Sequence, residues 1–250
     1  MNMYEDNLPK YYDVLYTDKK YEHECDLIKK YTVKGNLLDI GCGTMTHSLI
    51  LSESFDSVTG VDSSKSMVEV AMKKIKIADK KNLQVIHSEV EKLNFESEFD
   101  NVISMFNVVN HITSLKNLSS FFDSIHKSLT IGGTFIFDCW NGVACTLDRP
   151  REYSKKEIFD GYHTIISETI STTDLFESIC KMKTKVSIFD DISRIDEFTY
   201  ELEQKLWTPN LLKELLLVSG FENIKIIPFF DDTKEPKSSD YRLTFISKKL

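Results

Sequence analysis

The feature that most constrains the fold is an apolar run, residues 36–40, that ends in two closely spaced glycines, Gly41 and Gly43. A helical pattern follows, which is typical of a buried strand, a tight turn and a helix start. Because glycine lacks a Cβ and the first N–H groups of a helix are unpaired, such a turn can approach a polar or anionic ligand closely. A second apolar segment ends at Asp62, where open α/β sheets can hold both hydroxyls of a ribose. The two segments together predict a nucleoside site.

The residues around the glycines distinguish between two kinds of nucleoside site. A dinucleotide fingerprint would have a third glycine at position 46, which is threonine here. Asp39 instead precedes Gly41 by two residues, and the run Leu-Asp-Ile-Gly-Cys-Gly-Thr resembles the class I S-adenosylmethionine-dependent methyltransferases. In that family the first acid orients the glycine loop and the methionine amino group, and the strand-two acid, here Asp62, holds the ribose. The family often has glycine where Met45 stands.

This resemblance implies S-adenosylmethionine as cofactor and S-adenosylhomocysteine as product. The segment 88–93 also resembles the family's Gly-Asp-Ala-x-x-Leu turn, whose acid accepts a hydrogen bond from the adenine amine, so Glu89 is expected to bind adenine. The residues expected to bind the cofactor are Tyr16, Asp39, Gly41, Cys42, Gly43, Asp62, Ser63, Met67, Glu89, Val90 and Phe106.

The remaining pattern predicts an α/β fold. Further strands are predicted at residues 83–86, 99–106 and 134–138, with helices at 21–31 and about 64–76. Residues 224–230 and 241–247 predict the antiparallel hairpin that closes the methyltransferase fold. The resemblance therefore implies one class I methyltransferase domain over residues 1–250, built on a Rossmann-like seven-stranded sheet with an antiparallel C-terminal hairpin. Residues 1–34 are expected to form an N-terminal cover segment.

Between about residues 151 and 207 the helical periodicity gives way to alternation with a period of two. Residues 180–188 and 198–206 read as strands joined by a turn at 190–193, with a third strand at 161–170. Antiparallel pairing would set a lysine face opposite a glutamate face. The pattern predicts a small antiparallel β insertion. In resembling enzymes such an insertion covers the acceptor pocket and can join subunits, so a homodimer is one expectation and a purely structural flap is the alternative.

The loops after strands four and five should face the methyl acceptor, because ligands of doubly wound sheets lie outside the carboxyl ends of the strands. His111 lies in such a loop, and an unperturbed pKa near 6.5 suits a general base; a loop histidine bonded to backbone is the alternative. The N-terminal segment adds several tyrosines, Tyr4 among them, which could equally serve as packing cover. The residues expected to bind the acceptor are Tyr12, Asn110, Trp140 and Asn141, and no metal site is expected.

Composition narrows the acceptor and the location. A net charge of -8 and a pI near 5.3 argue against nucleic acid. The five cysteines lack C-x-x-C spacing, which favours reduced core cysteines. With no apolar run of about 20 residues, no membrane span is expected, and the protein is predicted to be cytoplasmic.

Three functions fit these observations. The leading prediction is methyl transfer to nitrogen or oxygen of a small polar acceptor, such as a nucleotide-linked sugar or another glycan or capsule intermediate in polysaccharide biosynthesis. The second is an NAD-type oxidoreductase, which position 46 disfavours. The third is a catalytically inert nucleoside-binding module.

Overall fold

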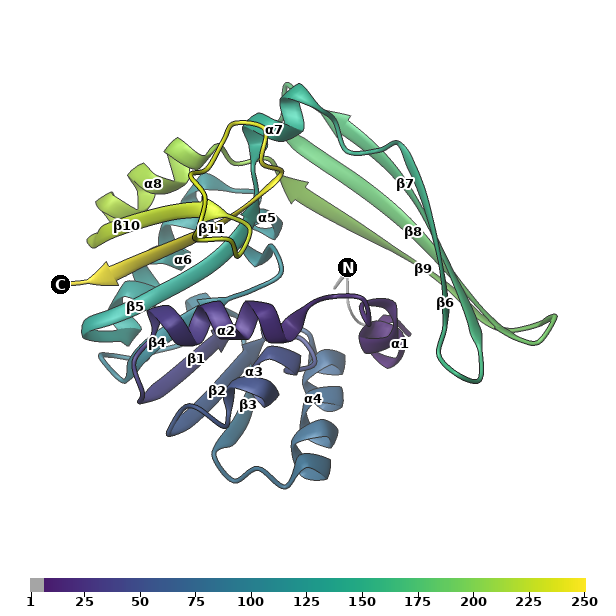
Figure 1. Cartoon of the computed structure of the whole chain (residues 1–250), viewed down its shortest axis with the longest axis horizontal. Coiled ribbons are helices and arrows are strands. Elements are labelled where there is room, and N and C mark those ends of the chain that lie inside the picture. Colours follow the sequence, from purple (N-terminus) through teal and green to yellow (C-terminus); the bar gives the residue numbers. More distant parts are fainter. Residues whose placement is uncertain (1–6) are drawn as a thin grey trace.

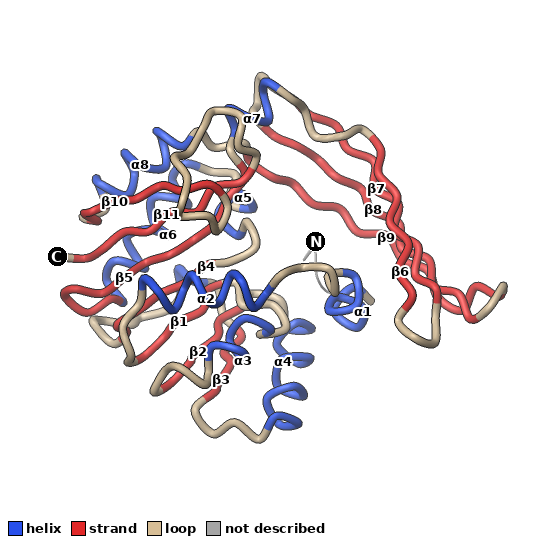
Figure 2. The backbone as a smooth tube through the Cα atoms, viewed as in Figure 1, coloured by secondary structure: helices blue, strands red, loops and turns tan. Residues whose placement is uncertain are grey.

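Two β-sheets organise the molecule, which is described for residues 7–250 by a computed structural model (Figure 1). The larger sheet has seven strands in the order β10-β11-β5-β4-β1-β2-β3, and the smaller has four in the order β6-β7-β8-β9. In Figure 2 the small sheet extends away from the large one, to which short connections join it. The expected site residues all lie within the described range, whereas Tyr4 lies outside it.

The seven-stranded sheet confirms the predicted fold class. Its strands are β1 (Asn36–Ile40), β2 (Ser57–Asp62), β3 (Leu83–His87), β4 (Phe99–Ser104), β5 (Leu129–Trp140), β10 (Phe221–Pro228) and β11 (Arg242–Lys249). The first five run parallel, and β11 pairs antiparallel with both β5 and β10. One boundary differs from expectation, because β5 begins at Leu129 and contains Gly132 and Gly133, which were expected to precede it.

Helices cover both faces of this sheet. They are α1 (Leu8–Leu15), α2 (Tyr21–Tyr31), α3 (Thr46–Leu51), α4 (Lys65–Ala78), α5 (Val108–His111), α6 (Leu115–Ser128), α7 (Gly142–Leu147) and α8 (Pro209–Val218), with a 3-10 turn at Val90–Lys92. Apolar residues of α2, α3 and α4 pack on one face, and those of α6 and α8 on the other. Ser64 caps α4 by accepting a hydrogen bond from the Met67 N–H; the sequence offers either Ser63 or Ser64 for this position. No described helix is long and apolar enough to cross a bilayer.

The four-stranded sheet confirms the predicted antiparallel insertion. Its strands are β6 (Tyr153–Phe159), β7 (Thr164–Asp174), β8 (Ile179–Asp190) and β9 (Ser193–Lys205). Register places Lys181 opposite Glu203 and Lys183 opposite Glu201, and these pairs form ion pairs of 2.9 and 3.0 Å on what we call the outer face. Strand β6 was not predicted, because most of its side chains are exposed and it carries no apolar alternation.

The opposite side of the insertion, its inner face, packs against α1. Leu8 and Leu15 of α1 share a buried cluster with Val186, Phe198 and Tyr200. Figure 1 shows α1 between the large sheet and the insertion. The N-terminal segment is therefore sandwiched between the two sheets and forms a wall common to both.

Candidate active site

A cavity of about 410 Å³ lies where the two sheets and α1 meet. Its floor is the switch point of the large sheet, at which the chain runs from β1 to β2 on one side and β4 leads to β5 on the other. Ligands of doubly wound sheets bind at such points. The predicted residues that line the cavity are Tyr12, Tyr16, Asp39, Gly41, Cys42, Gly43, Asp62, Ser63, Met67, Phe106, His111 and Trp140.

The turn after β1 is built from left-handed backbone. Gly41, Gly43 and Met45 have φ values of 70°, 54° and 62°. A Cβ on Gly41 would lie 2.6 Å from a methyl group of Val108, so this glycine is needed for space as well as for conformation. Beside Gly43 no atom lies within 4 Å of the position a Cβ would take, which leaves room for a ligand against the backbone.

Met45 adopts a left-handed conformation with its side chain fully buried in the core. A Cβ on Gly60 would lie 3.0 Å from both Sδ and Cε of Met45, so the thioether packs directly over that glycine of β2. The departure from the family's usual glycine is thus accommodated by a small residue in the neighbouring strand.

Two carboxyl groups flank the turn, Asp39 buried and Asp62 partly buried. The Asp62 Oδ2 atom accepts from the Gly43 N–H at 2.8 Å, and its Oδ1 accepts from the Ser64 N–H at 2.8 Å. Asp39 accepts from the Ser48 hydroxyl at 2.5 Å. Burial raises the pKa of Asp62, and it raises the pKa of Asp39 to about 6. Each carboxylate is therefore held in place by neighbours and would gain from a cationic or hydroxyl ligand.

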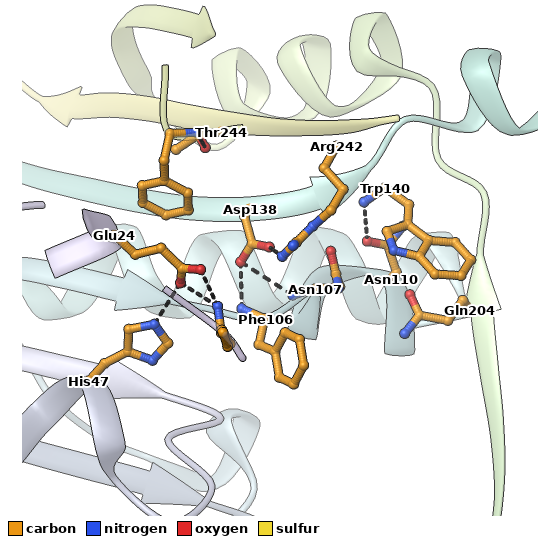
Figure 3. A network of polar contacts seen from close by, with 12 residues as sticks. Glu24, His47, Phe106, Asn107, Asn110, Asp138, Trp140, Gln204, Arg242 and Thr244 are labelled. Atoms are coloured by element: carbon orange, nitrogen blue, oxygen red, sulfur yellow. Dashed lines mark hydrogen bonds and ion pairs between the residues drawn. The ribbon is translucent and has the colours of Figure 1, made fainter. Parts of the chain in front are cut away.

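The loop between β4 and α5 is fixed by a carboxylate that the sequence analysis missed. Phe106 and Asn107 have φ values of 71° and 62°, which non-glycine residues seldom adopt. Their N–H groups donate to Asp138 Oδ1 at 2.5 and 3.3 Å, and Arg242 donates to Asp138 Oδ2 at 2.7 Å (Figure 3). Asp138 is fully buried, so its charge is compensated by this set of donors.

A second buried ionic cluster adjoins this loop. Glu24 of α2 accepts from His47 at 2.8 Å and pairs with Lys19. These contacts hold the pKa of Glu24 below its usual range even though burial opposes ionisation. Burial lowers the pKa of Lys19, whose ammonium lies 4.8 Å from the centre of the Phe106 ring. The cluster ties the chain before α2 to the cavity rim, which His47 and Phe106 both line.

A polar clamp fastens α1 over the glycine turn. Asp13 accepts hydrogen bonds from Thr44 and Thr46 at 2.5 and 3.2 Å, and it pairs with Lys74 of α4 at 2.8 Å. The next residues of the segment place aromatic rings on the cavity: the Tyr16 ring centre lies 4.8 Å from that of Tyr12. We call the four residues Asp13, Thr44, Thr46 and Lys74 the α1 clamp.

The far end of the cavity is formed by α5 and the insertion. His111 ends α5, and its Nε2 lies 3.3 Å from Nε2 of Gln204 on β9. Burial lowers the pKa of His111 to about 4, although a hydrogen bond to the Glu203 backbone opposes the shift. The imidazole therefore binds a proton more weakly than the unperturbed pKa near 6.5 would allow.

Four predicted site residues lie outside the cavity lining. Glu89 is exposed and pairs with Lys92 at 3.0 Å, and Val90 packs against the large core. Asn110 accepts from the Trp140 N–H at 2.9 Å and donates to the Lys205 carbonyl at 2.7 Å. Asn141 caps α7 and donates to two carbonyls of the loop before β11. The two asparagines thus join elements of the fold, and no acceptor contact is assigned to them by this geometry.

Sequence reasoning missed several residues that line the cavity. They are Leu8, Tyr21, Thr44, Thr46, His47, Met105, Asn107, Val108, Met182, Tyr200, Leu202, Gln204 and Arg242. One signal was available in the strand pattern, because Gln204 is a polar residue in phase with the inward-facing Tyr200 and Leu202. Arg242 and His47 carried no such signal.

These residues fit the cofactor that the resemblance implies. Asp62 offers carboxylate oxygens for a ribose, and Gly43 leaves open space beside the backbone. The rings of Tyr16 and Phe106, whose centres lie 4.8 Å apart, present aromatic surface that favours a sulfonium cation. Asp39 lies on the same cavity wall, where an ammonium group would find a negative partner.

Comparison with known proteins agrees with the geometry. Residues 37–133 match a methyltransferase domain family. The Bacillus subtilis (strain 168) protein YqeM, named provisionally as a methyltransferase, is 24% identical over 95% of this chain and 94% of its own length. A dTDP-3-amino-3,4,6-trideoxy-alpha-D-glucopyranose N,N-dimethyltransferase of Streptomyces venezuelae is 27% identical over 55% of this chain and 59% of its own.

Solved structures share the whole architecture. An S-adenosylmethionine-dependent methyltransferase from Clostridium acetobutylicum ATCC 824 superposes with a TM-score of 0.82 at 20% identity, with 96% of each chain covered. The sugar N-methyltransferase KedS8 from Streptoalloteichus sp ATCC 53650 gives 0.79 at 18% identity, covering 100% of this chain and 96% of its own.

The seven-stranded sheet, with its antiparallel C-terminal strands, has the class I methyltransferase fold. With the domain match, this chain is identified as an S-adenosylmethionine-dependent methyltransferase. The oxidoreductase and the inert binding module are accordingly set aside.

Proposed function

We propose that this enzyme methylates a nitrogen or oxygen atom of a small polar acceptor, with a sugar as the favoured class. The observation that carries the proposal is the shape of the site: one cavity runs from the glycine turn to the inner face of the insertion. Its acceptor end combines Trp140, Met182 and Leu202 with a few polar groups, as is usual for small-molecule pockets. The similarity to named sugar methyltransferases supports the same class.

When bound, S-adenosylmethionine supplies an electrophilic methyl group, so the chain's own residues have to align the acceptor and exclude water. The Tyr12 and Tyr16 rings, together with α1, cover the cavity from the N-terminal side. Trp140 and the inner face of the insertion cover it from the other side. Methyl transfer in this site depends mainly on how the acceptor is oriented.

His111 remains our candidate catalytic residue, in a changed role. A general base is most effective when its pKa lies near the working pH, and a pKa of about 4 makes the imidazole a weak base. Its neutral form has one ring nitrogen that donates and one that accepts, and its Nε2 lies 3.3 Å from the Gln204 amide nitrogen. We therefore infer that His111 acts by orienting groups at the acceptor end of the cavity more than by removing a proton.

The wider setting is also part of the proposal. The acidic net charge favours a small molecule over nucleic acid. We place the acceptor among cytoplasmic intermediates of polysaccharide biosynthesis, and the exposed outer face of the insertion is the surface we assign to a homodimer.

The test is a screen with isotope-labelled S-adenosylmethionine against amino sugars, neutral sugars, nucleotide-linked sugars, protein and nucleic acid, read by mass spectrometry. We expect label in a sugar or a similar small molecule. Transfer confined to protein or nucleic acid would overturn the proposal, since the enzyme would be active on a different class of acceptor.

A further inference from the structure

One carboxylate, Asp138 near the end of β5, is joined to the cavity wall without lying in the cavity. It is fully buried, and the described lining does not include it. Its Oδ1 atom accepts from the backbone N–H groups of Phe106 and Asn107 at 2.5 and 3.3 Å, and Figure 3 shows both bonds. Phe106 and Asn107 themselves line the cavity. Asp138 therefore reaches the site through the backbone of a neighbouring loop.

The backbone that these bonds hold is in an unfavourable conformation. Phe106 and Asn107 have φ values of 71° and 62° in succession. Residues with a Cβ avoid the left-handed region, so two in a row persist only where the surroundings hold them. Two N–H groups that donate to one carboxylate supply this hold, because hydrogen bonds to a charged acceptor are stronger than those between neutral groups. The shape of the loop thus depends on Asp138.

The loop places an aromatic wall of the site beside the glycine turn. The Phe106 ring packs edge-on against Tyr16, with ring centres 4.8 Å apart, and its centre lies 4.8 Å from the ammonium of Lys19. Val108 follows, and it packs so closely on the glycine turn that a Cβ on Gly41 would lie 2.6 Å from one of its methyl groups. A shift of the loop would therefore move the Phe106 ring and this contact together.

Arg242 of β11 compensates the charge of the buried carboxylate. It donates to Asp138 Oδ2 at 2.7 Å, and its guanidinium carbon lies 3.4 Å from the centre of the Phe229 ring. Without such a partner a buried carboxylate would be costly and would take up a proton. Arg242 thus donates to one oxygen and the loop to the other. This arrangement requires two acceptor oxygens at position 138.

We propose that Asp138 is a positioning residue for methyl transfer: it holds Phe106 and Asn107 in the left-handed turn that keeps the Phe106 ring available to the sulfonium of S-adenosylmethionine. The inference concerns the methyl donor, so it holds whichever acceptor the enzyme uses. S-Adenosylhomocysteine lacks the methyl group, and its sulfur is neutral. Because an aromatic face attracts a cation more than a neutral group, the placement of the Phe106 ring should set the ratio of the two affinities.

The variant Asp138→Asn tests the loop with the least change of shape. Its amide offers one acceptor oxygen where the carboxylate offers two. Since the bond to the charged Arg242 is the stronger one, the oxygen should stay with Arg242 and the NH₂ group should face the N–H groups of the loop. Asp138→Ala removes both acceptors. The matched control is Asp100→Asn, because Asp100 of β4 accepts from the Asn36 N–H at 2.8 Å and lies outside the described lining.

Calorimetry of S-adenosylmethionine and S-adenosylhomocysteine with each protein gives the ratio without any acceptor. We expect both Asp138 variants to weaken S-adenosylmethionine about five-fold more than S-adenosylhomocysteine, as loss of an aromatic contact with a cation predicts. The Asp100→Asn control should keep the parental ratio. Thermal unfolding followed by circular dichroism shows whether each variant is folded at the temperature of the titration.

A glycine at position 107 separates positioning from a direct effect of the carboxylate charge. Glycine adopts a positive φ without steric cost, so Asn107→Gly added to Asp138→Asn should recover about two-fold of the lost ratio. The single Asn107→Gly variant is the reference for this double variant.

A parental ratio in the Asp138 variants would overturn the inference. Equal weakening of both ligands would do the same, because it would show a general loosening of the cofactor site. A changed ratio that Asn107→Gly does not recover would assign the effect to the charge of Asp138 and also contradict a positioning role. If Asp138→Ala does not fold, Asp138→Asn and its double variant decide. The acceptor class is tested separately, by the screen with labelled S-adenosylmethionine.

Discussion

The two sheets of this molecule are built by opposite rules. The large sheet is covered by helices on both faces, and its central strands β1 and β4 are almost wholly buried. The insertion packs one face against α1 and exposes the other as paired lysines and glutamates. A doubly covered parallel sheet brings its strand ends to one shared edge, which suits a fixed cofactor site. A sheet with one free face can vary its inner residues with little effect on the cofactor half.

The largest effect is therefore expected from removing the insertion. Replacing residues 153–205 by a short Gly-Ser linker should abolish acceptor turnover, because Tyr200, Leu202 and Gln204 form one wall of the cavity. Binding of S-adenosylhomocysteine should persist in part, since Asp39, Gly43 and Asp62 are contributed by the large sheet. Circular dichroism and calorimetry check folding and binding. Full turnover by a folded variant would show that the insertion has no part in acceptor binding.

The second-largest effect is expected from removing the carboxylate that we assign to the ribose. Asp62→Ala should weaken both S-adenosylmethionine and S-adenosylhomocysteine by about 1.5–3 kcal/mol, as expected for hydrogen bonds to a charged group. The same change removes the acceptor of the Gly43 and Ser64 N–H groups, so the glycine turn should also loosen. Calorimetry measures the affinity. A variant that binds both ligands as tightly as the parent would remove Asp62 from the site.

A pH dependence of cofactor binding should follow from Asp39. Its pKa is raised to about 6, so below that pH the carboxyl group takes up a proton and no longer attracts an ammonium group. Affinity should fall as pH decreases through about 6, by up to about 10-fold per pH unit. Stability has the opposite sign: the folded state binds more protons than the unfolded one between about pH 4 and 6, so this group favours folding more as pH falls. Asp39→Asn should abolish this fall of cofactor affinity at low pH. If the fall is unchanged in the variant, a group other than Asp39 causes it.

The smallest effect is expected at the α1 clamp, which joins α1 to the glycine turn and to α4. Asp13 and Lys74 are partly exposed, with side chains 43% and 24% accessible, so their pair should contribute only about 0.2–1 kcal/mol. Asp13→Asn should speed cofactor dissociation about two- to five-fold, measured by stopped-flow fluorescence. Glu53→Gln, which breaks a surface pair with Lys80, is the control and should have no effect. Equal dissociation rates in all three proteins would show that α1 does not retain the cofactor.

Prediction from sequence succeeded where local pattern and fold coincide. The turn at Gly41 and Gly43, the acids at Asp39 and Asp62, and the Ser64 cap each depend on neighbours within a few residues. The paired lysines and glutamates of the insertion followed from a period of two and a turn at Asp191. Strand β6 was not predicted, because an edge strand with exposed side chains carries no such alternation.

Only part of the candidate site could be predicted from local sequence pattern. Asn110 and Asn141 follow strands β4 and β5 in the sequence, where acceptor ligands would be expected, yet Asn110 lies within α5 and both amides bind backbone groups of remote segments. Glu89 follows the family turn in sequence, but its side chain points into solvent beside Lys92. Which polar group faces a cavity depends on contacts between residues far apart in the chain.

The sequence by itself predicted the class of enzyme and the residues of the large sheet that line the cavity beside the glycine turn, because backbone conformation at that turn and strand periodicity are local properties. The tertiary structure decided the acceptor half. Burial lowers the pKa of His111, and its contact with Gln204 joins residues 93 positions apart. Burial and long-range pairing set both the pKa and the hydrogen-bond partners of such side chains, and neither is encoded by spacing along the chain.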